Sequence, residues 1–406
     1  MKVILLIGKI CCGKTTYAKS LGGMLISCDQ LMQSMFPGGC GEHHDMLAER
    51  ARINTFVRED WCAKLGIALP TTIEEFYNML VAFKENDMSA TYYGNARGST
   101  IPMSTGFDQW CWGQNVFYAG FGFTNWTNDI CNDLVLSDDG TVDFVSTWDG
   151  YRDAVTYFHN WYAEGLMDIE MFSQSTSQLI AKCSQGQVGV ATWWYIEEVM
   201  GDKSGDYVFL PILAGPDGTY NVTVRDGGAV NSGNLNITSA CSNPEALLKF
   251  YDMWYDGEVV MQLQYGPKGV FFTEQDEKGM WISITDAQAR EKYGKSAGEL
   301  KGVHEVYGPK LILSKYYNEN FYMEDRAIVR LEDLYYKWMQ PYVKSTTTYP
   351  IDCVYTQDEL AVIDRYKADF ESAVSEQEGL WLKNGGPTDE EWNAYVEMLT
   401  KNCGME

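Results

Sequence analysis

The sequence lacks several features that would each assign a class. No run of 18 or more apolar residues occurs in the 406 residues, so no segment is long enough to span a bilayer as a helix. No Cys-x-x-Cys pair occurs among the 11 cysteines, and their odd number argues against a complete disulfide framework. We therefore exclude a zinc ribbon and expect free, buried thiols in a reducing environment.

Positive charge is also scarce. The chain has 31 Lys and Arg residues against 56 Asp and Glu residues, a formal net charge of -25 at pH 7. A general nucleic-acid binder needs a basic face to displace counterions, and a membrane-surface helix needs basic residues on its polar side. The composition therefore excludes nucleic acid as a partner. With 45% hydrophobic residues, the chain has enough apolar side chains to form packed cores.

The charge is unevenly distributed along the chain. Residues 1–55 hold six basic and four acidic residues, a balance of +2. Subtraction from the totals leaves 25 basic and 52 acidic residues for residues 56–406, a balance of -27. We interpret this break as a boundary between two segments of different origin, with domains at 1–55 and 56–406. The length alone favours two to three domains at about 150 residues each.

The first segment contains a phosphate-binding pattern. The apolar run Lys2–Ile7 predicts a buried strand, and the sequence continues as Gly8-Lys9-Ile10-Cys11-Cys12-Gly13-Lys14-Thr15. Gly8 and Gly13 let successive backbone N–H groups face one anion. Lys14 would neutralise the β- and γ-phosphates of ATP, and the Thr15 hydroxyl would bind Mg²⁺.

Residues 1–55 resemble the start of the small P-loop kinases related to polynucleotide and zeta-toxin kinases. The resemblance rests on the P-loop, on Ile26-Ser27-Cys28-Asp29 and on Gly41-Glu42-His43-His44-Asp45. It implies that Asp29 helps to deprotonate a substrate hydroxyl. We find neither the apolar strand ending in Asp nor the Arg-bearing lid that such kinases need. This fragment is therefore expected to bind phosphate weakly and not to transfer it.

From Arg58 onward, the pattern predicts alternating helices and strands. Capping boxes open helices at Thr72, Thr356 and Thr388, and Asn243-Pro244 opens another. Apolar residues at helical spacing predict a further helix from about Tyr151 to Tyr162, ended by Gly165. Strands are predicted at the following runs: Leu134–Leu136 and Val142–Val145 as a hairpin, Val188–Thr192, and Leu235–Thr238.

This larger segment resembles the family 1 extracellular solute-binding proteins, the receptor subunits of carbohydrate ABC importers, in particular the long lipoproteins of Firmicutes. The matching stretches, in order, are Arg58–Trp61, Lys64–Gly66, Pro70–Tyr77, Ala82–Lys84, Tyr162–Asp168, Gly186–Val190, Ile237–Thr238, Asn243–Ala246, Asn384–Gly386 and Glu391–Val396. Each stretch is weak alone, and their order over about 350 residues carries the resemblance.

The resemblance implies an α/β, periplasmic-binding-protein-like (type II) fold with two lobes that hold a sugar between them. The second lobe would cover about residues 57–215, and the rest of the first lobe with the C-terminal helices about 216–406. It implies an oligosaccharide ligand, an ABC permease as partner, and no cofactor for this region. Because this family has about a hundred or more residues before the Arg58–Trp61 stretch, we expect the first lobe to be incomplete.

Aromatic side chains are the candidate ligand contacts, because sugar C–H faces stack on Trp and Tyr. Trp193 and Trp194 follow the strand where the family places a cleft aromatic, and Trp110 and Trp112 lie in a segment that also lines the cleft. All four can instead be core residues, since large aromatics are usually buried. The two interpretations stay open for Trp193 and Trp194, and the core is favoured for Trp110 and Trp112.

One loop departs from the family. The family often has an Asp-, Asn- and Gly-rich cation loop after the helix that here ends near Asn86. This chain reads Asp87-Met88-Ser89-Ala90-Thr91-Tyr92-Tyr93 there, so we predict no calcium.

Three hypotheses follow from the sequence. The chain is a carbohydrate-binding subunit impaired by truncation, an ATP-dependent phosphotransferase with an unusual C-terminal body, or a chimera joined near Ala51–Val57. The family is exported and lipid-anchored, whereas the run Val3–Ile7 is short for a secretory signal. The sequence as written therefore predicts a cytoplasmic location.

Overall fold

The computed structural model describes residues 54–106, 117–122, 134–136, 141–193, 196–210, 212–220, 222–223, 237–238, 240–306, 310, 316, 320–322, 343–345 and 356–405. Its contacts divide the chain into two compact units. Unit 2 holds the described residues up to 223 together with 343–345 and 356–405, and unit 1 holds those from 237 to 322. Each unit is described by itself.

Unit 2 is built on a four-stranded sheet in the order β2-β5-β1-β6. The strands are β1 (Asn54–Arg58), β2 (Ile101–Ser104), β5 (Val188–Trp193) and β6 (Tyr207–Phe209). β1 pairs antiparallel with both β5 and β6, whereas β2 pairs parallel with β5. The burial of every residue of β5 explains its continuous apolar sequence, because a strand covered on both faces has no polar side.

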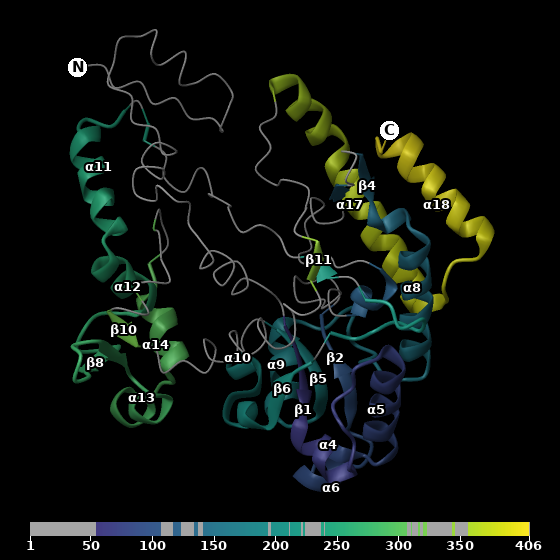
Figure 1. Ribbon diagram of the computed structural model, residues 1–406, viewed down its shortest axis with the longest axis horizontal. Helices are drawn as coiled ribbons and strands as arrows, with labels where there is room; N and C mark the ends of the chain where they lie inside the picture. The colour runs from purple at the N-terminus through teal and green to yellow at the C-terminus, as the bar shows by residue number, and fades with distance from the viewer. Residues whose placement is uncertain are drawn as a thin grey trace. The chain divides into compact units, whose positions relative to one another are not determined.

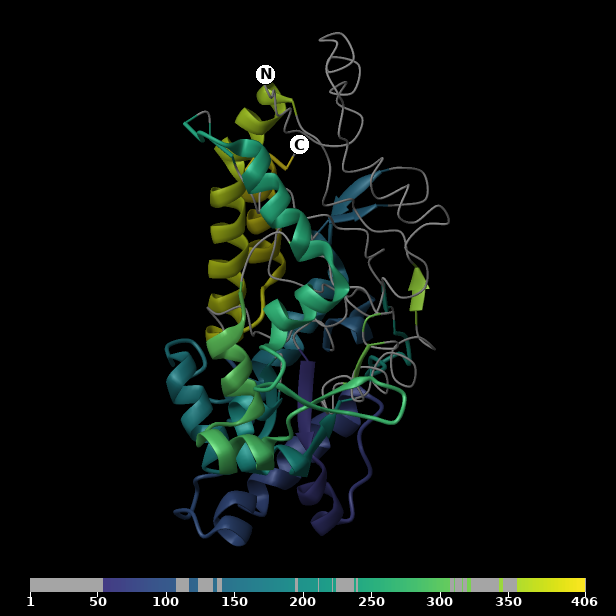
Figure 2. The ribbon, with the colours of Figure 1, turned by 90° about the vertical axis from the view of Figure 1, so that its left-hand side faces the viewer.

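Helices cover both faces of this sheet (Figures 1 and 2). Val57, Met103 and Val190 belong to a large core that includes α5 (Ile73–Glu85) and α8 (Asp149–Ala163). Phe56 and Ala191 belong to a second core with α9 (Thr176–Ser184) and α10 (Ile196–Met200). The alternation of side chains along β1 therefore divides its apolar residues between two cores.

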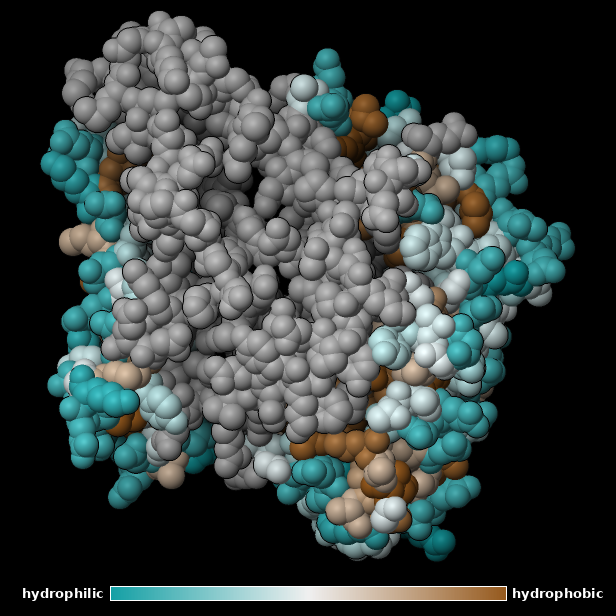
Figure 3. Space-filling model, viewed as in Figure 1, coloured by the Kyte–Doolittle hydropathy of each residue, from teal (hydrophilic) through white to brown (hydrophobic). Residues whose placement is uncertain are grey.

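The C-terminal helices pack on α8. α17 (Gln357–Asn384) and α18 (Asp389–Asn402) lie side by side (Figure 1). Trp381 and Trp392 have ring centroids 5.7 Å apart, and the Arg152 guanidinium of α8 reaches Asp389 at 2.7 Å. Hydrophilic side chains cover much of the described surface at the right-hand edge of Figure 3, where Figure 1 places α18. This amphipathic pattern explains how polar helices can complete an apolar core.

Arg58 is the largest buried charged residue in the described part of unit 2. Its guanidinium is fully buried and donates to both carboxylate oxygens of Asp60, at 2.6 and 2.7 Å. The rings of Trp61, Tyr93 and Tyr207 lie 4.5–5.1 Å from its central carbon. One side chain thus joins the end of β1 to α4 (Glu59–Leu65), α6 (Met88–Tyr93) and β6.

Smaller elements complete unit 2. Two short pairs are β3 (Leu134–Leu136) with β4 (Val142–Phe144), and β7 (Val222–Thr223) with β11 (Val343–Ser345). In the described ranges of this unit, 3₁₀ turns lie at Ala119–Phe121, Val145–Thr147 and Gly201–Asp206. The Tyr118 hydroxyl donates to Glu378 of α17 at 2.5 Å, deep in the core.

The described part of unit 1 contains a small sheet and several helices. The sheet has the order β10-β9-β8, with β8 (Phe272–Gln275) antiparallel and β10 (Phe321–Tyr322) parallel to β9 (Trp281–Ser283). The helices are α11 (Pro244–Asp252), α12 (Gly257–Tyr265), α13 (Asp286–Tyr293) and α14 (Ala297–His304), with a 3₁₀ turn at Met253–Tyr255. A core around Val260, Phe272 and Phe321 holds the unit together.

Most local predictions that fall on described residues are confirmed. The capping boxes at Thr72, Thr356 and Thr388 are formed, and Asn243 caps α11. The hairpin and the strand from Val188 are present. In the segment where the family often has a cation loop, Met88–Tyr93 forms the helix α6. The predicted strand Leu235–Thr238 lies largely outside the described residues, and Lys2–Ile7 lies entirely outside them.

The predicted domain boundary falls inside a strand. β1 runs across the position between residues 55 and 56, and it is a central strand of the sheet. The interpretation of residues 1–55 as a separate domain concerns residues almost all of which are outside the described part, and it stays a prediction.

Candidate ligand-binding edge of the sheet

Two parallel strands of unit 2 end at the same edge. Ser104, the last residue of β2, lies beside Ala191, near the end of β5. Ligands of open α/β sheets bind outside the carboxyl ends of the strands. We therefore take this edge as the candidate binding site, and name it the carboxyl edge.

A row of three threonines crosses the sheet near this edge. Thr55 of β1 lies opposite Thr192 of β5, and the Thr192 hydroxyl is 2.6 Å from that of Thr105, which follows β2. All three side chains are buried. The Thr55 Oγ1 has no hydrogen-bond partner in the described part of the chain. A buried hydroxyl without a partner is costly, so this atom marks a place where a ligand hydroxyl would add stability.

A polar network fixes the end of β2. The Gln174 side chain donates from Nε2 to the Thr105 carbonyl oxygen at 2.6 Å and accepts at Oε1 from Lys182 at 2.9 Å. Lys182 also donates to Asp168 at 2.7 Å, and Asp168 accepts from the Ser104 hydroxyl at 2.6 Å. Because Gln174, Ser104 and Asp168 are buried, these bonds fix the backbone at the carboxyl edge without help from solvent.

The charges in this network stabilise one another. Burial alone would lower the pKa of Lys182, but hydrogen bonds and ion pairs with Asp168 and Glu170 outweigh burial and raise it. Lys182 is therefore a cation at every physiological pH, and it holds the two carboxylates of the loop that follows Met167.

Only one of the predicted site residues can be placed. Trp193 lies at the end of β5, where its side chain is 3% exposed and belongs to the core with Phe56 and Ala191. Trp194 follows it directly but lies outside the described residues, as do Trp110 and Trp112. The ligand-binding role of these four residues stays a prediction.

The nucleotide-binding candidates lie outside the described residues. These are Gly8, Gly13, Lys14 and Thr15 of the P-loop, with Thr15 as the predicted Mg²⁺ ligand, and Asp29 as the predicted catalytic residue. Their predicted roles, and those of ATP and Mg²⁺, stay predictions.

The sequence analysis did not identify the threonine row or Gln174. Thr55, Thr105 and Thr192 are far apart in the chain, and threonine is common at strand ends. The parallel pairing of β2 with β5 brings Thr105 and Thr192 together. No local sequence pattern predicts that pairing.

Hydrogen bonds join the two ends of the segment from residue 87 to residue 100, which follows α5. Asp87, with φ of 42°, accepts from the Gly98 N–H at 2.6 Å and from the Thr100 hydroxyl at 2.8 Å. Within the ranges that the structure describes, no three His, Cys, Asp or Glu side chains gather as a metal site. The prediction that this segment binds no calcium stays a prediction.

One match, from residue 52 to residue 260, decides the family. The model of the bacterial extracellular solute-binding proteins matches residues 52–260, about half of the chain. The chain belongs to this family. Its structural neighbours include solute-binding proteins of mixed α/β content, in agreement with the α/β class that the sequence predicts. Among the described helices, none is both long and apolar enough to cross a membrane.

A fructooligosaccharide-binding protein is among its relatives. The chain is 30% identical over 350 residues to FusA, the substrate-binding protein of a fructooligosaccharide ABC transporter in Streptococcus pneumoniae. The alignment covers 85% of this chain and 62% of FusA. The structure of FusA with kestose superposes with a TM-score of 0.72 at 27% identity, covering 89% of this chain and 71% of that one.

A more distant structure supports the fold alone. An extracellular solute-binding protein from Bifidobacterium longum subsp. infantis superposes with a TM-score of 0.67 at 18% identity, covering 94% of this chain and 81% of that one. The chain spans less than two thirds of the length of FusA. The family's description places its members outside the cell, and the location of this chain stays a prediction.

Proposed function

We propose that the chain binds oligosaccharides of the fructooligosaccharide class for an ABC importer. The observation that supports this most strongly is the similarity to FusA, whose structure contains kestose, over 89% of this chain. The carboxyl edge lies in the matched family region and carries buried hydroxyl groups. The same proposal includes an ABC permease as the partner of this chain.

The carboxyl edge gives this proposal its chemistry. Sugar hydroxyls are both donors and acceptors, so they can bond to a threonine hydroxyl in either direction. The Thr55 hydroxyl is buried without a partner in the described part of unit 2. The predicted Trp194, Trp110 and Trp112 would supply the apolar faces on which sugar rings stack, whereas Trp193, at the end of β5, is buried in the core with Phe56 and Ala191.

A pair of hydroxyl deletions tests the proposal. Thr55→Val keeps the shape of the side chain and removes the unpaired hydroxyl, so we expect kestose affinity to fall roughly fivefold to tenfold while stability rises. Ser146→Ala is the matched control, because the Ser146 hydroxyl is also buried without a described partner but belongs to a 3₁₀ turn and not to a strand of the sheet. We expect this control to retain full affinity.

Calorimetric titration with kestose, with maltotriose as the comparison sugar, gives the readout. Absence of binding by the unaltered protein to any oligosaccharide would contradict the proposed function. Equal loss of affinity in both variants would instead contradict the role of Thr55 alone.

We also propose how the chain divides into two lobes. We place the second lobe at about residues 57–215 and the remainder of the first lobe with the C-terminal helices at about 216–406, with the first lobe incomplete. The contact division near residue 226 supports the boundary between the two lobes, but it groups the C-terminal helices α17 and α18 with the residues before 226. A chimeric origin near residues 51–57 belongs to the same proposal, and sequencing of the genomic DNA across codons 45–65 tests it.

The nucleotide-binding proposal for residues 1–55 is separate and rests on the motif alone. ATP with Mg²⁺ would bind at Lys14 and Thr15, and Asp29 would act only if phosphate is transferred. Filter binding of radiolabelled ATP to the intact protein tests it. Binding that is absent, or that is unchanged by Lys14→Ala, would contradict it.

A further inference from the structure

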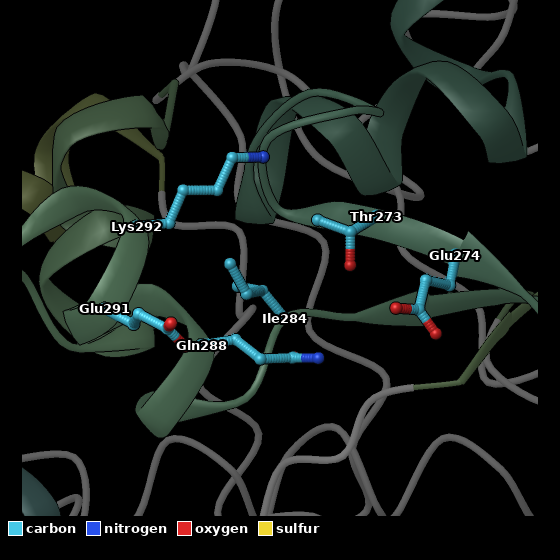
Figure 4. Close-up of a pocket in the computed structure, with 6 residues that line it drawn as sticks. All are labelled: Thr273, Glu274, Ile284, Gln288, Glu291 and Lys292. Atoms are coloured by element: carbon cyan, nitrogen blue, oxygen red, sulfur yellow. The ribbon is translucent and has the colours of Figure 1, made fainter.

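Unit 1 contains an open pocket that is separate from the carboxyl edge. It lies between β8 and α13 and has a volume of about 480 Å³, within the range of small-molecule sites. Figure 4 shows the other lining side chains arranged around Ile284. The lining residues are Thr273, Glu274, Ile284, Gln288, Glu291 and Lys292.

Hydrogen-bonded elements form the walls of the pocket. Ile284 is 3% exposed, and its backbone N–H donates to the Phe271 carbonyl at 2.7 Å. β8 pairs with β9, and Thr285 caps α13 through a complete capping box. The lining side chains therefore start from backbone whose direction is fixed, which lowers the entropic cost of binding.

Gln288 is oriented by that capping box. Its Oε1 accepts from the Thr285 N–H at 2.9 Å and from the Thr285 hydroxyl at 3.1 Å. Because the Thr285 N–H can bond only to the oxygen of the Gln288 amide, this bond distinguishes Oε1 from Nε2. Its Nε2 group is left to donate elsewhere, and Gln288 lines the pocket.

The other polar groups of the pocket are also available. Within the described residues, the side chains of Thr273, Glu274, Glu291 and Lys292 form no hydrogen bond or ion pair, although Lys292 lies 5.1 Å from the Tyr293 ring. The pocket thus offers two carboxylate acceptors, amide and ammonium donors, and a hydroxyl that does both. Ile284 provides an apolar contact beneath them.

This set of groups selects among ligand classes. The two carboxylates outweigh the one ammonium, so the pocket repels a phosphate or another anion. The ammonium of Lys292 and the donor of Gln288 oppose a simple metal cation. Alternating donors and acceptors around a small apolar surface suit the hydroxyls and C–H groups of a sugar.

We propose that the pocket lined by Thr273, Glu274, Ile284, Gln288, Glu291 and Lys292 binds a neutral polyhydroxylated molecule, one or two sugar units in size. The binding is weak, because most of the polar groups are exposed and give up water to form each new bond. The site does not depend on the carboxyl edge, so it stands apart from the function proposed above.

Methyl NMR of the full chain tests this inference. We titrate kestose into protein labelled at isoleucine methyl groups, with Ile284→Val to assign the Ile284 resonance. We expect a saturable shift of that resonance with a dissociation constant in the millimolar range. Failure of the carboxyl edge to bind kestose leaves this signal unchanged, so the two proposals are distinguished.

Two substitutions have matched controls. Gln288→Glu keeps an acceptor for the capping box but removes the donor, and we expect at least fivefold weaker binding. Glu299→Gln is its control, because Glu299 occupies the same position in the capping box of α14. Glu274→Ala should also weaken binding at least fivefold, whereas Glu277→Ala, in the exposed turn after β8, should not.

Three results would overturn the proposal. The first is the absence of a saturable shift at Ile284. The second is an equal shift in Gln288→Glu, Glu274→Ala and the unaltered protein. The third is a shift produced by calcium chloride and not by kestose.

Discussion

Arg58 shows how a single side chain can join four elements. Its charge is paired with Asp60, and its faces contact three aromatic rings. Burial alone would lower its pKa, but the hydrogen bond to Asp60 and neighbouring charges outweigh burial and raise it. The guanidinium is therefore a permanent charge that the surrounding side chains must balance.

Replacement of Arg58 should destabilise unit 2 strongly. We expect Arg58→Met to lower the free energy of unfolding by about 3 kcal/mol, because it removes one partner of a buried ion pair. Arg97→Met, at an exposed arginine, is the control and should cost little. Urea unfolding followed by circular dichroism measures both. Equal midpoints for the two variants would contradict the role assigned to Arg58.

The capping box of α5 makes the stability of the folded chain depend on pH through Glu75. Glu75 accepts from the N–H and hydroxyl of Thr71 and from the N–H of Thr72, and the first of these is the largest cause of its lowered pKa. Because the folded-state pKa lies below the ordinary value of 4.5, the carboxylate adds stability above that pH. This stability is lost as the pH falls through the folded-state pKa.

Glu75→Gln should therefore reveal a pH-dependent difference. We expect the variant to be less stable than the unaltered protein at pH 7 and the difference to shrink steadily below pH 4.5. Thermal unfolding between pH 3 and pH 7 measures it, with Glu74→Gln on the same helix turn as the control. A difference that is constant with pH would show that the charge of Glu75 contributes nothing.

The segment after α5 gives a prediction about metal removal. Because Asp87 already accepts from Gly98 and Thr100, its carboxylate closes the segment without a cation. We expect EDTA or added calcium to leave the melting temperature unchanged within about 1 °C, and Asp87→Ala to lower it by several degrees. Differential scanning calorimetry measures both effects. A calcium-dependent increase that disappears in Asp87→Ala would contradict the prediction.

Sequence patterns identified elements better than their pairing. The boxes at Thr72, Thr356 and Thr388 were predictable, because the pattern and its result lie within four residues. The boxes at Ser175, Thr285 and Ser296 have the same spacing but were not identified. The buried Gln174 and the threonine row depend on contacts between distant strands, for which one sequence contains no local signal.

The helices of the chain differ in how deeply they are buried. α8 buries Ala154, Val155, Phe158 and Trp161, whereas no residue of α11 is buried. Since opening a helix without buried contacts costs little, local stability should vary widely along the chain.

Hydrogen exchange should reveal this difference. We expect the amides of α11 to exchange at least a hundredfold faster than those of α8 at neutral pH, because only α8 is covered by a core. Mass spectrometry of peptides spanning each helix measures the rates, and α5, with five buried residues, is the internal standard. Equal protection of α11 and α8 would contradict this ranking.

The position of β1 in the sheet has a consequence for synthesis on the ribosome. Its partners are Val190 to Trp193 of β5 and Tyr207 to Phe209 of β6, all more than 130 residues later in the chain. Phe56 and Val57 must therefore leave the exit tunnel long before anything can pair with them. Until about residue 193 is translated, the nascent chain presents an apolar strand with two free edges, and one edge stays free until about residue 209. We expect chaperones to bind such an unpaired strand.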